Sequence, residues 1–330
     1  MPVADVLLVR NASTLARDEL AEREPPLTRA FEIAPGIQLS GVKKEVARQV
    51  LYACEFRHPE PDGDTITYGF VRYDPPGRRW DEDQQISKAL YLSHVAHAHE
   101  AGFELSARIE TDDRGRLVRL EPAKVLPWYA RAYCCAGVTR RWLTQADAEE
   151  LRDLIVAYDA AREYLRHKRI GMAVSLFADS CFVYHGRSRV SLLAAILEGL
   201  VCISPERALK QFTVRIPALA AEVRLPQFNR NWADRMYKLR SKLVHGVPLF
   251  QSPQHEQRQL AIDEVNTAMT DMDELVRQLI KRALLDRGFA DRVHDVATHW
   301  PVAGKGCARC RGRVPTLSEI QCPRCGSKWT

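Results

Sequence analysis

The tract YKLRSKLVHG, residues 237–246, places Arg240 and His245 five positions apart in a strongly basic segment. An imidazole can donate or accept a proton near neutral pH, and a guanidinium can stabilise charge that develops on a phosphate. Cleavage of an RNA phosphodiester by its own 2′-hydroxyl needs these two roles and no metal ion. Arg240, His245 and the intervening Ser241 are therefore candidate catalytic residues.

Four other residues have the spacing of metal ligands. Cys307 with Cys310 and Cys322 with Cys325 form two Cys-x2-Cys pairs, separated by 11 residues that suit a hairpin. Two such pairs present four thiolates to one tetrahedral ion, which predicts a zinc ribbon with a structural Zn²⁺. Because protein ligands would fill all four positions, hydrolysis at the zinc is not expected.

Basic side chains are interleaved with these cysteines. Residues 301–330 hold 6 Lys and Arg against 1 acidic residue, which accounts for most of the chain's net charge of +6. Arg309, Arg311 and Arg313 are therefore candidate contacts for RNA phosphates. A docking role or a purely structural role for the ribbon stays open, because zinc-bound thiolates also attract neighbouring Lys and Arg side chains.

A helix over residues 227–246 is expected to carry the catalytic tract. At about 100° per residue, one apolar stripe faces the core and Arg240 lies at its edge, whereas His245 lies about 140° from Arg240. The same helix carries the candidate RNA-binding residues Arg235, Lys238 and Lys242. The predicted stripe consists of Trp232, Met236, Leu239 and Leu243.

Two arrangements would bring an arginine and a histidine together despite this divergence. Gly246 and Pro248 end the helix at His245, so its last turn could unwind and redirect the imidazole. Alternatively, two chains could pair about a two-fold axis and each supply Arg240 and His245 to one cleft.

The pattern of the whole chain predicts an α+β protein. Residues 1–143 are expected to form a mixed α/β domain, residues 144–288 an α-helical bundle, residues 289–303 a linker, and residues 304–330 the zinc ribbon. Segments 103–111 and 115–126 are expected to pair as a hairpin. Helices are expected at 42–56, 83–102, 144–167, 169–184, 188–202, 205–220, 227–246 and 256–288.

Composition limits the functional class. The first residues lack the basic flank and apolar length of a signal peptide, and no apolar segment has the roughly 18 residues of a membrane span. The nine cysteines are odd in number and show only metal-type spacing, which favours a reducing compartment. A cytoplasmic protein without a membrane segment is expected.

Three features in order resemble HEPN domains (higher eukaryotes and prokaryotes nucleotide-binding), notably their Apea-like branch. The first is the LLAAILEGL segment with Glu198, the second is FTVRIPAL with Arg215, and the third is the Arg240 and His245 motif. The resemblance implies a dimeric helical domain, often a metal-independent endoribonuclease of toxin, phage-defence or RNA-processing systems. Active members often have Asn, Asp or His after the motif arginine, where this chain has the uncharged Ser241.

The expected function is a homodimeric endoribonuclease acting on RNA in prokaryotic anti-phage defence, with a phage or host protein as a possible trigger. The alternatives are a non-catalytic nucleic-acid-binding adaptor and a protein-interaction module built on an inactive HEPN domain. Glu198 is expected to bond Arg215 or the helix of Arg240 in a structural role, with a minor catalytic or positioning role as the alternative. His94, His97 and His99 are expected on a solvated helix face rather than at a metal.

Overall fold

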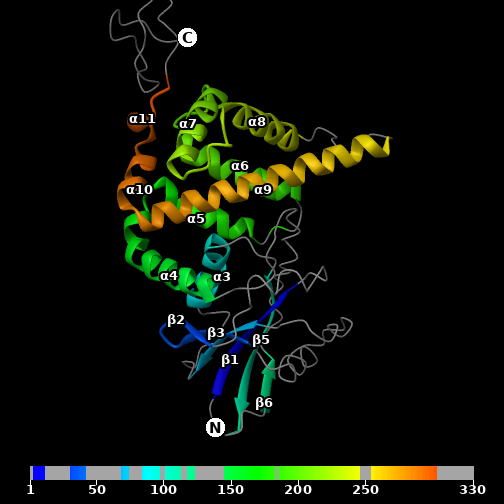
Figure 1. The fold of residues 1–330 in the computed structure, drawn as a ribbon, viewed down its shortest axis with the longest axis vertical. Helices are drawn as coiled ribbons and strands as arrows, with labels where there is room; N and C mark the ends of the chain where they lie inside the picture. The colour runs from blue at the N-terminus through cyan, green and yellow to red at the C-terminus, as the bar shows by residue number, and fades with distance from the viewer. Residues whose placement is uncertain are drawn as a thin grey trace, which may run out of the picture. The chain divides into compact units, whose positions relative to one another are not determined.

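A computed structural model describes residues 3–11, 30–41, 68–73, 84–96, 101–112, 117–122, 145–181, 183, 186–245 and 254–302. The described residues form an α+β protein (Figure 1). They divide into two compact units, the first within residues 1–160 and 178–186 and the second within residues 161–177 and 187–330. None of the described helices combines the length and the hydropathy needed to cross a membrane.

The first unit contains an antiparallel sheet. Its six described strands lie in the order β2-β3-β4-β1-β5-β6, and β5 pairs with β6 as the predicted hairpin. Gly36 has a φ of 71°, which the tight turn between β2 and β3 requires. The strands are β1 (Val3–Asn11), β2 (Phe31–Ala34), β3 (Ile37–Gly41), β4 (Tyr68–Tyr73), β5 (Ala101–Thr111) and β6 (Leu117–Pro122).

Helix α3 (Gln84–Ala96) belongs to this unit and packs against α4 (Gln145–Leu165) at Tyr158 and Asp159. Lys88 Nζ lies 2.7 Å from both carboxylate oxygens of Asp159, and the rings of Tyr91 and Tyr158 meet edge to face. The expectation of a solvated histidine face is wrong at His94, whose exposed fraction is 3%. The reason is that the whole last turn of α3, from Leu92 to Ala96, is buried. His97 and His99 lie outside the described residues.

The second unit is helical, as predicted for this part of the chain. The buried residues of α6, α7, α8 and α9 form its core, and the 31-residue α9 extends its N-terminal half beyond the neighbouring helices (Figure 1). Its helices, after the end of α4, are α5 (Arg169–Ser180), α6 (Gly186–Val201), α7 (Ala208–Glu222), α8 (Arg230–Val244), α9 (His255–Leu285), α10 (Arg287–His294) and α11 (Val296–His299).

Residues 289–302 do not form the predicted linker. Residues 289–294 lie in α10 and residues 296–299 form α11, and Phe289, Val293 and Val296 are fully buried. The Asp286 carboxylate caps α10 by accepting from Phe289 N at 3.1 Å, and Trp300 O accepts from Arg215 Nε at 2.8 Å. The apolar spacing of this short segment was therefore a core signal.

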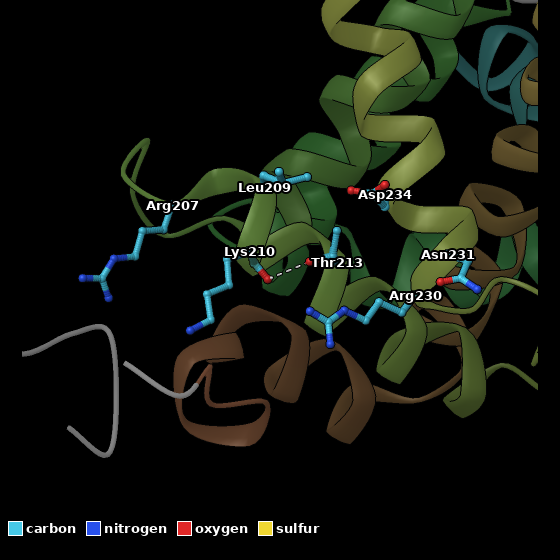
Figure 2. Close-up of a pocket in the computed structure, with 7 residues that line it drawn as sticks. All are labelled: Arg207, Leu209, Lys210, Thr213, Arg230, Asn231 and Asp234. Atoms are coloured by element: carbon cyan, nitrogen blue, oxygen red, sulfur yellow. Dashed lines mark hydrogen bonds between the residues drawn. The ribbon is translucent and has the colours of Figure 1, made fainter. Parts of the chain in front are cut away.

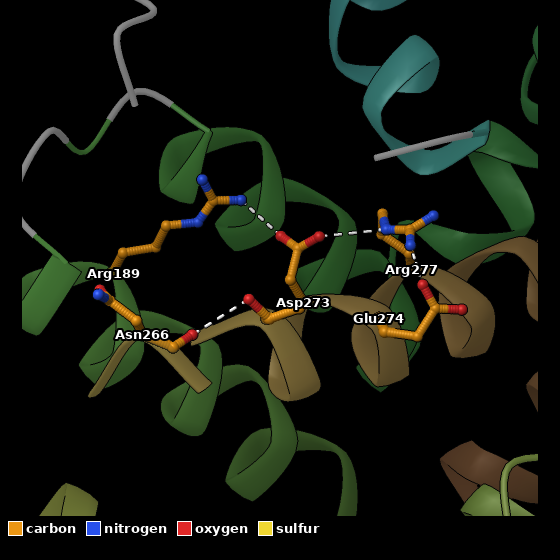
Figure 3. A network of polar contacts seen from close by, with 6 residues as sticks. Arg189, Asn266, Asp273, Glu274 and Arg277 are labelled. Carbon is orange, nitrogen blue, oxygen red and sulfur yellow. Dashed lines mark hydrogen bonds and ion pairs between the residues drawn. The ribbon is translucent and has the colours of Figure 1, made fainter. Parts of the chain in front are cut away.

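A buried ion network joins α6 to α9 (Figure 3). Asp273 accepts from Arg189 Nη2 at 2.5 Å and from Arg277 Nε at 3.1 Å, and Arg277 also contacts Glu274. The side chains of Arg189 and Asp273 are 0% and 3% exposed. Charged groups this deeply buried are tolerated when they are paired, so Asp273 holds two arginines in the core.

Candidate active site

Helix α8 carries the predicted catalytic tract and begins at a polar cap. The Asn229 side chain accepts from the backbone N–H groups of Asn231 and Trp232, at 3.0 and 3.2 Å. The Trp232 indole packs on Phe228 and donates to Asp271 at 2.8 Å. Of the predicted apolar stripe, Trp232, Met236 and Leu239 are buried and Leu243 is partly buried. These contacts fix the rotation of α8 in the bundle.

Arg240 lies at the edge of that stripe and reaches across to α6. Its Nη2 donates to Glu198 Oε2 at 2.9 Å, and the two side chains are 27% and 19% exposed. Glu198 therefore bonds the helix of Arg240, which was one of the two partners expected for it. Arg215, the other expected partner, instead donates to Val201 O at 2.6 Å and to Gln211.

Burial dominates the electrostatics around Glu198. It raises the pKa of the Glu198 carboxyl, and the nearby Arg240 guanidinium only partly opposes this change. Burial, followed by the charge of Glu198, raises the pKa of Tyr237 and raises the pKa of Cys202 to about 11. Cys202 is therefore a thiol near neutral pH and is not an activated nucleophile.

His245 ends α8 without any unwinding. Its backbone N–H donates to Ser241 O at 3.0 Å, so the last turn remains α-helical and Arg240 and His245 diverge by about 140°. His245 is exposed, and Ser241 is half-buried. Within one chain the structure therefore does not bring the two candidate catalytic side chains together.

His245 instead shares a face of α8 with the candidate RNA-binding residues. Arg235, Lys238, Lys242 and His245 lie within an arc of about 80° around the helix axis, and all four are exposed. Lys238 is paired with Asp234 at 2.6 Å. The result is a basic face that runs along α8 and ends at the imidazole.

Two further arginines hold the carboxyl end of α6, close to Glu198. Arg169 Nη1 donates to Gly199 O at 2.8 Å and to Cys202 O at 2.9 Å, and Arg215 donates to Val201 O. Sequence reasoning missed Arg169, because its role depends on packing between α5 and α6. Cations at the last carbonyl groups of a helix are a known stabilising pattern.

The predicted zinc ligands Cys307, Cys310, Cys322 and Cys325, together with Arg309, Arg311 and Arg313, lie outside the described residues. Within the described residues, no cluster of three or more His, Cys, Asp or Glu side chains is arranged to hold a metal ion.

No protein-family model, curated protein or solved structure matches the chain. The resemblance to HEPN domains therefore depends on the three sequence features around Glu198, Arg215 and the Arg240 and His245 motif.

Proposed function

We propose that this protein is a dimeric, metal-independent endoribonuclease of the HEPN type. The observation that carries the proposal is the basic face of α8, which ends at an exposed His245, one and a half turns beyond an Arg240 held by Glu198. Such a face can guide the phosphates of an RNA strand to a group that transfers protons.

In the proposed reaction, the 2′-oxygen of RNA attacks the adjacent phosphorus and the bond to the 5′-oxygen breaks. A His245 imidazole moves the protons, and Arg240 stabilises the charge on the phosphorane-like transition state. The products are a 2′,3′-cyclic phosphate and a 5′-hydroxyl end. Glu198 positions Arg240, because the pair fixes the guanidinium at the edge of the bundle.

Dimerisation supplies the geometry that one chain lacks. A two-fold axis repeats every surface residue, so Arg240 of one chain and His245 of another can face one cleft. The first turns of α9, residues 255–264 and here called the α9 arm, have no buried residue. The arm exposes Leu260 and Ile262, and Val244 beside His245 is 53% exposed. These apolar groups suit a contact with a second copy.

A mixing experiment tests the composite site. Arg240→Ala and His245→Ala are each expected to abolish cleavage of a labelled RNA in EDTA. When the two inactive chains are exchanged into mixed dimers, about half of the dimers contain both variants and each of these regains one intact site. About a quarter of native activity should therefore return.

No recovery of activity, with exchange verified by mass spectrometry, would contradict the composite site, because a site within one chain cannot be complemented.

Ser241→Asn on the native chain is a further test. This variant has a side chain that active HEPN members often carry after the motif arginine, so if Ser241 limits the rate without preventing cleavage, the variant should cleave faster than the native chain.

One observation favours a non-catalytic alternative. The Glu198 carboxylate neutralises Arg240, whereas Arg235 and Lys242 stay exposed, so α8 could bind nucleic acid without cutting it. Binding of RNA with no cyclic-phosphate product at any enzyme concentration would favour this adaptor. A ribbon with Zn²⁺ on Cys307, Cys310, Cys322 and Cys325, and a cytoplasmic role in anti-phage defence, complete the proposal.

A further inference from the structure

A pocket of about 590 Å³ lies between the first turns of α7 and α8 (Figure 2). Neither Glu198 nor the Arg240 and His245 motif lines it. Its walls include Arg207, Leu209, Lys210 and Thr213 from the start of α7, and Arg230 and Asp234 from the start of α8. Two helices that are adjacent in sequence therefore present side chains to one open pocket.

The charge of this pocket is positive. Arg207, Lys210 and Arg230 line it against one carboxylate, Asp234, which already binds Lys238 at 2.6 Å. The guanidinium groups of Arg207 and Arg230 have no hydrogen-bond or ion-pair partner among the residues that the structure describes. Figure 2 shows Lys210 and Arg230 extending to the same side of the pocket, whereas Asp234 lies toward Leu209.

The backbone at the pocket also favours an anion. Helix α7 starts after Arg207 with no side-chain cap, whereas Asn229 caps α8. Uncapped N–H groups in the first turn of a helix can donate hydrogen bonds to a ligand, and anions are preferred there. The uncapped start of α7 therefore adds to the positive charge of the three side chains.

The size of the pocket exceeds that of an inorganic anion. Small-molecule sites typically have volumes of about 300–1,000 Å³, and this pocket also offers the apolar side chain of Leu209, which is 39% exposed. A ligand with one phosphate and one flat, partly apolar group fits both properties. A nucleotide unit has this composition.

We infer that this pocket binds the phosphate of a nucleotide unit, with Arg207, Lys210 and Arg230 on the phosphate and Leu209 against the ribose or base. The unit can belong to a single-stranded RNA or to a free mononucleotide. Arg230 and Ser241 lie within about 20° on the same side of α8, about 16 Å apart along its axis. An RNA strand held at the pocket can therefore continue toward His245. This path rests on the proposed function, whereas binding of a nucleotide unit at the pocket does not.

The test compares the full-length chain with Arg207→Ala/Arg230→Ala. The RNA probe is a fluorescent single-stranded 2′-O-methyl oligonucleotide, which lacks the hydroxyl needed for cleavage. If RNA is the source of the phosphate, the double variant should bind about tenfold more weakly, and the slope of log K against log salt should fall by about 0.7 for each lost contact. If a free nucleotide is the source, AMP or UMP should bind the native chain in calorimetry and not the variant, with RNA affinity unchanged.

Two further variants make the result specific. Leu209→Asp adds a negative charge to the pocket and should weaken the same probe that the double variant weakens. Arg162→Ala removes an exposed arginine of α4 that does not line the pocket, and should change neither probe.

The pocket assignment is overturned if the double variant binds every probe like the native chain, or loses no more affinity than Arg162→Ala. Cleavage of unmodified RNA, measured in parallel, separates the two proposals. Binding at the pocket without cleavage contradicts only the nuclease, and cleavage with unchanged binding contradicts only the pocket.

Discussion

At the scale of single residues, Glu198 links the electrostatics of α6 to those of α8. Its carboxylate is bonded to Arg240 but is also partly buried, and burial is the larger influence because it raises the pKa of Glu198. The free energy that burial adds to the ionisation of Glu198 offsets part of its attraction to Arg240, so the net gain from the pair is small. Arg240 is therefore positioned by Glu198 and can still be recruited by a phosphate.

Glu198→Gln should reveal this balance as a dependence of stability on pH. Because the pKa of Glu198 is raised in the folded state, protonation contributes stability that is complete below the ordinary value of 4.5 and is lost as pH rises through the raised value. Glutamine keeps the uncharged form at every pH. The free energy of unfolding of the native chain, relative to the variant, should therefore fall as pH rises from 4.5.

Urea unfolding of both chains over a series of pH values measures this difference. A difference that is constant, or that increases with pH, would mean that the ion pair with Arg240 outweighs burial. In that case Glu198 would act as a conventional stabilising partner of Arg240.

Residue patterns predicted the face of α8 but not the environment of every charge. The 100° rule identified Trp232, Met236 and Leu239 as core and Arg240 as an edge residue, because one strongly amphipathic helix contains that information. It could not show that Arg189 is buried, since its partner Asp273 comes from a distant segment. It also could not show that His94 is buried, since the last turn of α3 is buried on all its sides.

At the scale of helices, the Asp273 carboxylate links α9 to α6 through Arg189. Asp273→Asn should cost about 3–5 kcal/mol of folding free energy, because Arg189 and Arg277 would remain buried without a compensating charge. Asp263→Asn is a matched control on the same helix, where the exposed side chain accepts a hydrogen bond from Gln259. Its expected effect is within about 0.5 kcal/mol.

The midpoints of urea unfolding compare these two variants directly. Equal effects of Asp273→Asn and Asp263→Asn would show that water or a rearranged partner satisfies the buried arginines. The network would then contribute little to the stability of the bundle.

Two glycines make a second matched pair at this scale. A Cβ at Gly171 would lie 2.1 Å from the carbonyl oxygen of Leu165, whereas a Cβ at Gly199 would meet no atom within 4 Å in the described residues beyond the backbone of its own helix. Gly171→Ala should therefore destabilise the protein by more than about 1 kcal/mol, because α5 must move away from the end of α4. Gly199→Ala should stabilise it by about 0.5–1 kcal/mol, because alanine loses less backbone entropy within α6.

Thermal unfolding of both alanine variants tests the pair. A Gly171→Ala variant as stable as the native chain would contradict the close approach of α4 and α5. Loss of stability in Gly199→Ala would show that the exposed side of α6 is covered in solution.

The positions of the long helices were largely predictable from the sequence, whereas the two short helices before residue 300 were not. The predicted segments of α5 to α9 agree with the structure because each has its own apolar period and turn signals. Helices α10 and α11 were missed because eight and four residues are too short for a clear period. Their burial follows from contacts such as Arg215 with Trp300.

At the scale of the whole molecule, metal and catalysis should be separable. If Cys307, Cys310, Cys322 and Cys325 hold Zn²⁺, the native chain should contain about one zinc ion, and Cys307→Ser/Cys310→Ser should contain none. Cleavage in EDTA should persist, because Arg240 and His245 need no metal. Elemental analysis and an RNA assay on the same samples measure both, and cleavage that returns only with added zinc would contradict the separation.

The composite site requires that two chains associate, and the α9 arm offers the means to test this. Leu260 in the arm is 64% exposed and Leu285 at the opposite end of α9 is 59% exposed, so the two leucines are matched in type, helix and exposure. If the arm contacts a second copy, Leu260→Asp should shift the protein from dimer to monomer in light scattering, because a carboxylate would be buried at the contact. Its cleavage rate per chain should then rise with protein concentration as dimers re-form. Leu285→Asp should leave both the mass and the rate unchanged.

A native chain that is monomeric at concentrations where it cleaves RNA would exclude a site shared between Arg240 and His245 of different chains, whatever the two variants do.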